Sequence, residues 1–284
     1  MQLQDSEIEL QITDLFEEIF LKYKYDFRDY SQASMKRRIA QAIHSMDYKG
    51  IPELKAKALD DPLCFTQLLQ FLTIPVSEMF RDPTYYSAFR EKVIPILRTY
   101  PSIKIWIAGC STGEEVYSFA IILKEEGLLE RSIIYATDIN EASLARARAG
   151  IYRLKDFQKF TSNYQRSGGK AQFSDYYTAD DDAAIFNSSL RKQITFTDHS
   201  LATDSVFSEV HFISCRNVLI YFQKQLQDRA IGLFHESLCR KGFLGLGSKE
   251  SIAFSSFKTG FDDLVTREKL YRKNENSNPQ GEIC

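Results

Sequence analysis

Histidine, cysteine and tryptophan are scarce in this sequence of 284 residues, which holds four His, five Cys and one Trp. No HExxH motif is present, so the sequence offers little for metal catalysis. The cysteines are odd in number and form no CxxC pair, which argues against a disulfide framework and against a zinc site. They are Cys64, Cys110, Cys215, Cys239 and Cys284. We therefore expect no metal cofactor, and a reducing compartment, the cytoplasm, as the location.

Long apolar runs and an excess of one charge are also missing. No stretch approaches the roughly 18 consecutive apolar residues of a membrane span, and the N-terminus lacks the basic start and apolar run of a signal peptide. Lys and Arg number 36 against 38 Asp and Glu, a net charge of −2, so no global attraction draws the chain to nucleic acid. We expect a globular protein that neither binds nucleic acid nor inserts directly into a membrane.

The first 72 residues predict an all-α domain, because apolar residues recur there at helical spacing. Helical segments are expected over 8–20, 31–46, 52–58 and 64–71. The segment 31–46 is expected to bury one apolar face, made of Ile39, Ala40 and Ile43. Its opposite face is expected to be basic, with Lys36, Arg37 and Arg38.

Beyond residue 73, short apolar runs alternate with amphipathic helices, which predicts an α/β structure with a mostly parallel sheet. Strands are expected over 103–108, 132–137, 193–196, 210–214, 243–246 and 269–272, with helices over 141–149 and 224–240. Residues 152–191 are polar and interrupt this alternation, so we interpret them as an inserted subdomain of short strands. The polar residues 274–284 predict a disordered tail.

A strand-to-helix loop carries the strongest chemical signal, in the segment WIAGCSTGEEVYS at 106–118. Gly109 and Gly113 permit a close approach of the backbone to a ligand. The loop lacks the GxGxxG pattern of a dinucleotide site, and Glu114 and Glu115 would repel a pyrophosphate but could hold an ammonium group. S-adenosylmethionine, which bears a cation and no phosphate, suits the loop better than NAD. A plain turn whose acidic residues favour the helix dipole is the alternative.

Asp138 stands where the next expected strand ends, in the segment ATDIN at 136–140. An acidic residue at this place can accept hydrogen bonds from both ribose hydroxyls of a nucleoside. It could instead cap the helix that begins near Glu141, but Asn140 is the better candidate for that cap. The sequence therefore favours Asp138 as a ligand of the ribose.

Four motifs in order resemble the CheR family of chemotaxis receptor methyltransferases: TIPVSEMFRDP at 73–83, WIAGCSTGEEVYS, ATDIN, and SCRNVLIYF at 214–222. The resemblance covers nearly the whole chain. It implies a Rossmann-like class I S-adenosylmethionine-dependent methyltransferase domain over 73–273. A small antiparallel β-subdomain would be inserted at about 152–191, and a helical N-terminal domain over 1–72 would recognise the substrate.

The resemblance also implies an activity: transfer of a methyl group from S-adenosylmethionine to glutamate carboxylates of chemotaxis receptors, giving a glutamate methyl ester and S-adenosylhomocysteine. Arg81 and Tyr221 match the residues beside the transferred methyl and the substrate carboxylate. The positions that match the cofactor pocket, together with the glycine taken from the loop above, are Ser77, Arg81, Gly109, Glu115, Asp138, Ser200, Leu201, Cys215 and Arg216.

The chain departs from the family pattern at several positions. The family often has Asn at Pro75, Thr at Ser77, Phe at Met79 and Asn at Ser200. Ser77 keeps a hydroxyl, whereas Pro75 has neither a side-chain amide nor a backbone donor, which puts one cofactor contact in doubt.

The family's example gives Lys36, Arg37 and Arg38 a partner, the acidic face of a receptor helix in the cytoplasmic region of the receptor. A solvated helix face is the alternative for these three charges. In some relatives the inserted subdomain binds a receptor C-terminal peptide by strand addition, and the sequence leaves that open here. Two other functions also stay open: a non-catalytic module that binds the cofactor or its product as a signal, and a methyltransferase for another protein or a small molecule.

Overall fold

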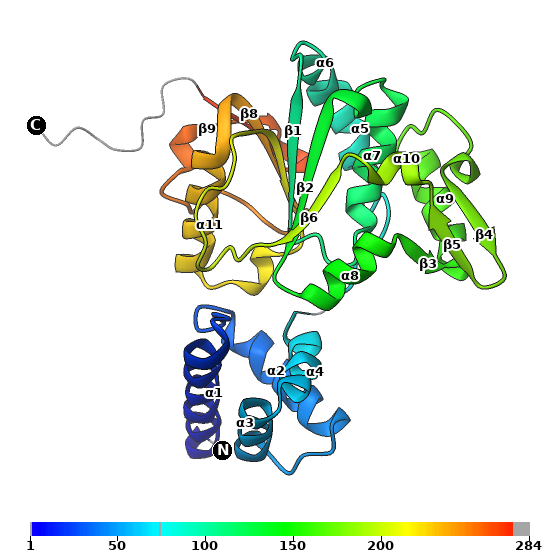
Figure 1. Ribbon diagram of the computed structural model, residues 1–284. Coiled ribbons are helices and arrows are strands. Elements are labelled where there is room, and N and C mark those ends of the chain that lie inside the picture. The colour runs from blue at the N-terminus through cyan, green and yellow to red at the C-terminus, as the bar shows by residue number, and fades with distance from the viewer. Residues whose placement is uncertain (1, 74, 275–284) are drawn as a thin grey trace, which may run out of the picture.

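The structure is a computed structural model that describes residues 2–73 and 75–274. It consists of a helical region, a large mixed sheet with its covering helices, and a separate small sheet (Figure 1). The segment that forms the small sheet lies, in the sequence, between two strands of the large one. Of the tail expected over 274–284, only Asn274 lies within the described residues. None of the described helices is long and apolar enough to cross a membrane.

The helical region contains four helices: α1 (Gln2–Tyr23), α2 (Gln32–Ser45), α3 (Ile51–Asp60) and α4 (Pro62–Thr73). They correspond to the four helical segments expected from the apolar spacing. Their shared core is made of large apolar side chains, among them Leu15, Phe16, Phe27, Met35, Leu54 and Leu68. The Tyr23 ring stacks on Phe65 at a centroid distance of 3.9 Å, which fastens the end of α1 to α4.

The orientation expected for α2 is wrong. The helix buries Met35, Arg38, Ile39 and Ala42, whereas Ala40 is exposed and Ile43 is half-buried. Residues 35, 38, 39 and 42 share one face of a helix, so Arg38 belongs to the buried face and not to the basic one. Its guanidinium donates to the carbonyl of Leu72 and lies 4.2 Å from the centre of the Tyr221 ring. Lys36 is half-buried and Arg37 exposed, so they alone represent the expected basic face.

The large sheet has seven strands in the order β6-β2-β1-β7-β8-β10-β9. The strands are β1 (Ile103–Ala108), β2 (Ser132–Asp138), β6 (Ile194–Asp198), β7 (Val210–Cys215), β8 (Leu238–Leu246), β9 (Phe261–Val265) and β10 (Leu270–Lys273). The five strands from β6 to β8 are parallel, and β10 and β9 add an antiparallel edge. The six strands expected from the sequence are present, and β9 is additional. The two aspartates of β9, Asp262 and Asp263, are exposed, so this edge strand does not form an apolar run in the sequence.

Helices cover both faces of the large sheet. The residues of α11 (Lys224–Ser237) pack on one face with Trp106 and Ile213. On the other face α7 packs with Ile105 and Phe212, together with the chain from α5 to α6. The segment from α5 to α6 comprises α5 (Pro83–Ala88), the π-helical turn η1 (Phe89–Val93) and α6 (Ile94–Leu97). The helix α7 (Glu114–Glu125) follows β1, and α8 (Glu141–Ala149) follows β2. The short 3₁₀ turns are η2 (Leu129–Arg131), η3 (Leu154–Asp156), η4 (Phe173–Tyr176), η5 (Leu219–Tyr221), η6 (Lys258–Gly260) and η7 (Thr266–Glu268).

The inserted segment forms a separate antiparallel sheet in the order β3-β5-β4, beside α7 and away from the helical region (Figure 1). Its elements are β3 (Ile151–Arg153), α9 (Phe157–Arg166), β4 (Tyr177–Asp180), β5 (Ala183–Phe186) and α10 (Ser188–Arg191). The helix α9 was not expected. Aromatic side chains such as Phe157 and Phe186 form its core, and the Glu125 carboxylate at the end of α7 accepts the Tyr176 hydroxyl at 2.9 Å. The insertion is therefore fastened to the large sheet through α7.

Candidate cofactor and substrate cavity

A cavity of about 340 Å³ lies between the carboxyl ends of β1, β2 and β7 and the helical region. Residues of the helical region that line it include Tyr30, Arg38 and Thr73. The Asn140 side chain, at the start of α8, donates to the Thr73 hydroxyl at 2.8 Å and accepts from Gln70 at 3.2 Å. These bonds hold α4 against the end of the sheet. The carboxyl edge of parallel strands is the usual ligand site of such folds, and here the helical region closes it.

Gly109 begins the loop that leaves β1, with a φ of +71°. A Cβ at this position would lie 2.4 Å from a methyl carbon of Val218, so any other residue would clash as well as strain the backbone. The N–H groups of Gly109 and Cys110 both donate to the Thr137 carbonyl at 2.8 Å. The glycine is thus required by the closeness of two loops, and both loops line the cavity.

Asp138, at the end of β2, lines the same cavity. Its carboxylate accepts one N–H from Ser111 at 2.8 Å and one from Asn140 at 2.9 Å, a separate oxygen for each. Burial raises the pKa of Asp138, and these backbone bonds counter the rise. Each oxygen keeps acceptor capacity for a hydroxyl group. The helix cap of α8 is Asn140, whose side chain accepts from Ser143, so Asp138 is not the cap.

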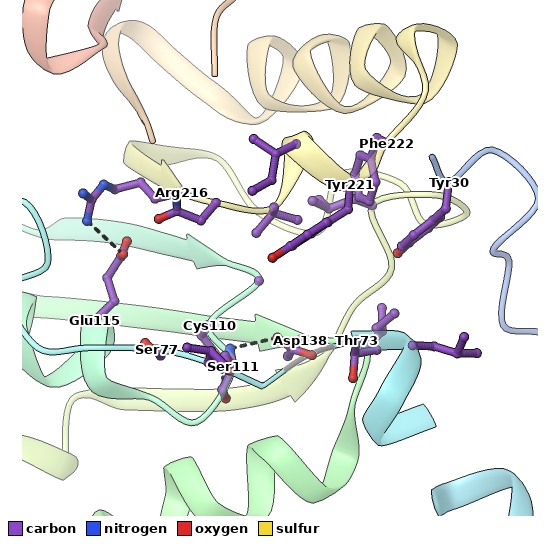
Figure 2. A pocket seen from close by; sticks show the side chains of 18 of the residues that line it. Tyr30, Thr73, Ser77, Cys110, Ser111, Glu115, Asp138, Arg216, Tyr221 and Phe222 are labelled. Carbon is purple, nitrogen blue, oxygen red and sulfur yellow. Dashed lines mark hydrogen bonds and ion pairs between the residues drawn. The ribbon is translucent and has the colours of Figure 1, made fainter. Parts of the chain in front are cut away.

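The two acidic residues at the start of α7 point to different surroundings. Glu115 lines the cavity and Glu114 does not. Glu115 accepts from the Ser214 hydroxyl at 2.6 Å and pairs with Arg216 at 3.2 Å (Figure 2). Glu114 is buried, and burial raises its pKa while hydrogen bonds from Thr112 and Ser77 lower it. Only Glu115 is placed to meet a ligand.

Arg216 is buried within an ionic network. It pairs with Asp82 at 2.8 Å as well as with Glu115, and its guanidinium lies 4.1 Å from the centre of the Tyr85 ring. It also donates to the backbone carbonyl of Arg81 at 2.9 Å. Arg216 therefore fastens the loop after β7 to the segment that carries Arg81.

Arg81 and Tyr221, predicted beside the reacting groups, line one cavity. The guanidinium of Arg81 is half-buried and has no ion pair or hydrogen bond within the described part of the chain. The hydroxyl of Tyr221 points into the cavity, as does that of Tyr30 (Figure 2). Tyr30 packs edge-on against Phe222 at 4.8 Å, and the Ser31 N–H donates to the Tyr221 carbonyl at 2.7 Å. The helical region thus reaches the loop that carries Tyr221.

The remaining predicted positions divide. Ser77 and Leu201 line the cavity, whereas Ser200 and Cys215 are not among its lining residues. The Ser200 hydroxyl accepts the N–H of Ala202 in its own turn, and the Cys215 thiol is fully buried. For these two positions the structure adds no support to a direct contact with the cofactor.

Sequence reasoning missed several cavity residues. Tyr30, Thr73, Ser111 and His199 line it. Thr73 and Ser111 lie within two of the four motifs but were not singled out there, and Tyr30 and His199 lie outside all four. For Arg38 a signal existed, because it stands three residues after Met35 and next to Ile39, on the apolar stripe of α2. A buried arginine on such a stripe requires a partner, and the cavity and Tyr221 supply one.

The residues present fit S-adenosylmethionine. The loop at Gly109 leaves no room for a side chain, Asp138 keeps acceptor capacity for a ribose, and Glu115 offers a carboxylate without a phosphate site. No group of three His, Cys, Asp or Glu side chains that could hold a metal ion occurs within the described residues.

Comparison with known proteins points in the same direction. The family described as CheR methyltransferase, SAM binding domain, matches residues 75–268. Cher3 of Pseudomonas putida is 60% identical over 265 residues, which cover 93% of this chain and 97% of that protein. A chemotaxis protein methyltransferase of Listeria innocua is 32% identical over 229 residues, covering 80% of this chain and 84% of that one.

Among solved structures, the N-methyltransferase NodS from Bradyrhizobium japonicum in complex with S-adenosyl-L-homocysteine is 13% identical. The match covers 60% of this chain and 62% of that one with a TM-score of 0.34, too low to support a conclusion about function. The family match spans more than half of the chain. This protein therefore belongs to the CheR methyltransferases and is an S-adenosylmethionine-dependent methyltransferase.

Proposed function

We propose that this protein transfers the methyl group to glutamate side chains of chemotaxis receptors, giving glutamate methyl esters and S-adenosylhomocysteine. The observation that carries the proposal is the guanidinium of Arg81, which lines the cofactor cavity and has no partner within the described residues. Curated relatives of this chain are named chemotaxis protein methyltransferases, which supports a receptor as substrate.

A carboxylate substrate agrees with the side chains around the cavity. The cofactor, when bound, supplies an electrophilic methyl group on a sulfonium. Glutamate is already ionised at neutral pH, since its reference pKa is about 4.3, so no general base has to remove a proton. The work left to the protein is to orient the carboxylate and to exclude water.

Arg81 is the group that would orient the incoming carboxylate. Its planar fork can donate two parallel hydrogen bonds to one carboxylate, which fixes direction as well as position. Tyr221, in the loop after β7, would add a hydroxyl group as a second donor. Asp138 and the backbone around Gly109 would hold the nucleoside part of the cofactor, and Glu115 would hold its ammonium group.

Arg38 is assigned a role different from that of its two neighbours. Because it is buried over the Tyr221 ring, it would keep that ring in place and add positive charge to the substrate end of the cavity. Burial lowers the pKa of Arg38, and the nearby Tyr221 and Tyr30 rings favour its charged form. Lys36 and Arg37 remain as the charges that would meet an acidic receptor helix outside the cavity.

We also propose the division of labour expected from the sequence. Residues 1–72 would recognise the substrate, residues 73–273 would bind the cofactor and catalyse transfer, and the insertion at 152–191 would be a subdomain of its own. The cytoplasm is the proposed location, because the glutamates concerned lie in the cytoplasmic part of the receptor.

The experiment is incubation of the purified chain with isotopically labelled S-adenosylmethionine and a cytoplasmic receptor fragment. We expect label on glutamate residues by mass spectrometry, released as methanol by mild alkali because it is held as an ester. Label that resists alkali would place the methyl group on nitrogen and refute the carboxylate. Absence of label, with intact S-adenosylhomocysteine binding, would refute the receptor as substrate.

A further inference from the structure

Glu250, on the turn that follows β8, is a buried carboxylate outside the cavity. The residue is 4% exposed and has no ion pair with any described residue. One oxygen accepts the N–H groups of Gly247 at 2.6 Å and Asn217 at 3.0 Å, and the other accepts those of Val218 at 2.8 Å and Ile220 at 3.3 Å. An unpaired buried charge is costly, and four N–H donors are what makes this one tolerable.

Three of these donors belong to residues 216–222, the 216–222 loop, which connects β7 to α11. Asn217, Val218 and Ile220 all line the cavity, whereas Glu250 does not. Asn217 has a φ of +62°, so the loop departs from regular structure at the point where Glu250 holds it. Without the carboxylate, three N–H groups of a cavity wall would lose their partner.

The same loop carries Tyr221. Its N–H donates to the Val218 carbonyl at 3.1 Å, so Tyr221 is one hydrogen bond away from a residue that Glu250 binds directly. On its other side the Tyr221 carbonyl accepts from Ser31 of the helical region. The backbone of Tyr221 is thus bonded on one side to the part of the loop that Glu250 binds and on the other to Ser31 of the helical region.

Gly247 shows how closely the two loops approach. A Cβ at this position would lie 2.7 Å from the Glu250 carboxylate and 2.9 Å from the Asn217 nitrogen. No residue but glycine leaves both contacts in place. The turn after β8 is therefore built around the contact between Glu250 and the 216–222 loop.

We propose that Glu250 is a positioning residue, whose carboxylate fixes the 216–222 loop and thereby orients Tyr221 for methyl transfer. This inference rests on the proposed role of Tyr221. Burial raises the pKa of the Glu250 carboxyl and its four backbone hydrogen bonds oppose the rise, as expected for an anion held by N–H groups.

The first test is Glu250→Gln in the full chain. The amide presents an NH₂ group to one pair of N–H donors whichever way it turns, so two of the four bonds are lost. We expect methyl transfer at saturating cofactor to fall about 100-fold, as displaced catalytic groups do, with less than about tenfold loss of S-adenosylhomocysteine affinity.

Asp228→Asn is the matched control. Asp228, on α11, also accepts hydrogen bonds in a neighbouring loop, from the Ser255 hydroxyl at 2.6 Å and the Ser256 N–H at 2.8 Å, and it does not line the cavity. We expect it to lower thermal stability and to leave transfer within about twofold. An equal loss of transfer in both variants would overturn the proposal.

The second test combines Glu250→Gln with Tyr221→Phe. If Glu250 acts through Tyr221, its substitution should change transfer by less than about threefold once the hydroxyl is gone, because coupled residues are not additive. A full loss on top of Tyr221→Phe would show that Glu250 acts by another route.

If the Glu250→Gln variant does not fold, backbone amide hydrogen exchange in the unaltered protein tests the same proposal. In the unaltered protein we expect the amides of Asn217, Val218, Ile220 and Gly247 to exchange slowly despite their loop positions. Exchange at the rate of open loops would refute the proposal. If the unaltered protein transfers no methyl group to the receptor fragment, the proposed substrate is wrong, while exchange still decides whether Glu250 holds the loop.

Discussion

Two sides of the cavity differ in how they are built. One side, the sheet wall, consists of Gly109 and Ser111 in the loop after β1 and of Asp138 at the end of the neighbouring parallel strand β2. Hydrogen bonds between the loop and the strand end hold this wall together. On the other side lie Tyr30 and Tyr221, which belong to chain segments far apart in the sequence (Figure 2). A hydrogen bond from the Ser31 N–H to the Tyr221 carbonyl joins these segments.

We call Tyr30, Arg38 and Tyr221 the interface wall. The sheet wall carries groups suited to a nucleoside, and the interface wall carries a cation and two hydroxyls suited to a carboxylate. On the proposed function, this difference implies that cofactor binding would depend on the strand ends, whereas substrate positioning would depend on the helical region being in place. Variants on the two walls should therefore separate cofactor affinity from methyl transfer.

The largest effect is expected from Arg81, which lies on the segment between α4 and α5 that connects the walls. Arg81→Ala should lower transfer about 1,000-fold, as loss of a charge-stabilising donor does, with little change in melting temperature. Methyl transfer to the receptor fragment measures the loss of activity, and thermal unfolding measures the melting temperature. Arg81→Lys, which keeps the charge without the planar fork, should recover only part of the activity. Near-normal turnover of Arg81→Ala would show that the assigned role is wrong.

Next comes the sheet wall. Asp138→Asn should weaken S-adenosylhomocysteine binding about 100-fold, because hydrogen bonds to a charged acceptor contribute about 1.5–3 kcal/mol each. Calorimetric titration measures the affinity, and transfer should recover in large part at saturating cofactor. Unchanged affinity would break the assignment of the sheet wall to the cofactor.

Substitutions in the interface wall should instead lower methyl transfer and leave cofactor affinity nearly unchanged. Arg38→Met keeps an apolar side chain of similar length but removes the charge over Tyr221, so transfer should fall about 30-fold while S-adenosylhomocysteine affinity stays within about threefold. Arg37→Met, on the exposed face of the same helix, is the control and should change neither quantity by more than about twofold. Equal effects of the two variants would contradict the buried role of Arg38.

The smallest effect is expected outside the cavity. Replacing Lys36 and Arg37 together by Glu should raise the KM for the receptor about tenfold and leave cofactor affinity unchanged, through lost steering of an acidic helix. The effect should shrink as salt is added, because exposed charges are screened. An effect independent of salt would point to a change in folding instead.

Local patterns in the sequence located much of the fold and half of the site. The strand expected over 103–108 and the helix expected over 141–149 agree with β1 and α8 residue for residue. Apolar periodicity is a property of neighbouring residues, which is why it is readable without a structure. Gly109 and Asp138 were found for a related reason, since parallel strands bring their carboxyl ends to one edge.

Edge and inserted elements were harder to find. The strand β9 carries exposed aspartates, and α9 lies in a polar segment that we expected to form a subdomain of short strands only. Their apolar contacts are made to residues distant along the chain, such as Phe186 for α9. The spacing of apolar residues along the sequence does not predict which distant residues they contact.

The sequence by itself determined the class of fold, the cofactor and the strand ends that would hold it, because these follow from periodicity and from short motifs. Only the tertiary structure decided that Arg38 lies buried over Tyr221, that Tyr30 lines the cavity, and that Glu250 holds the loop beside them. Each of these contacts joins residues far apart in the chain. Their burial and hydrogen bonding arise only when the helical region packs against the sheet and when the loops after β7 and β8 meet.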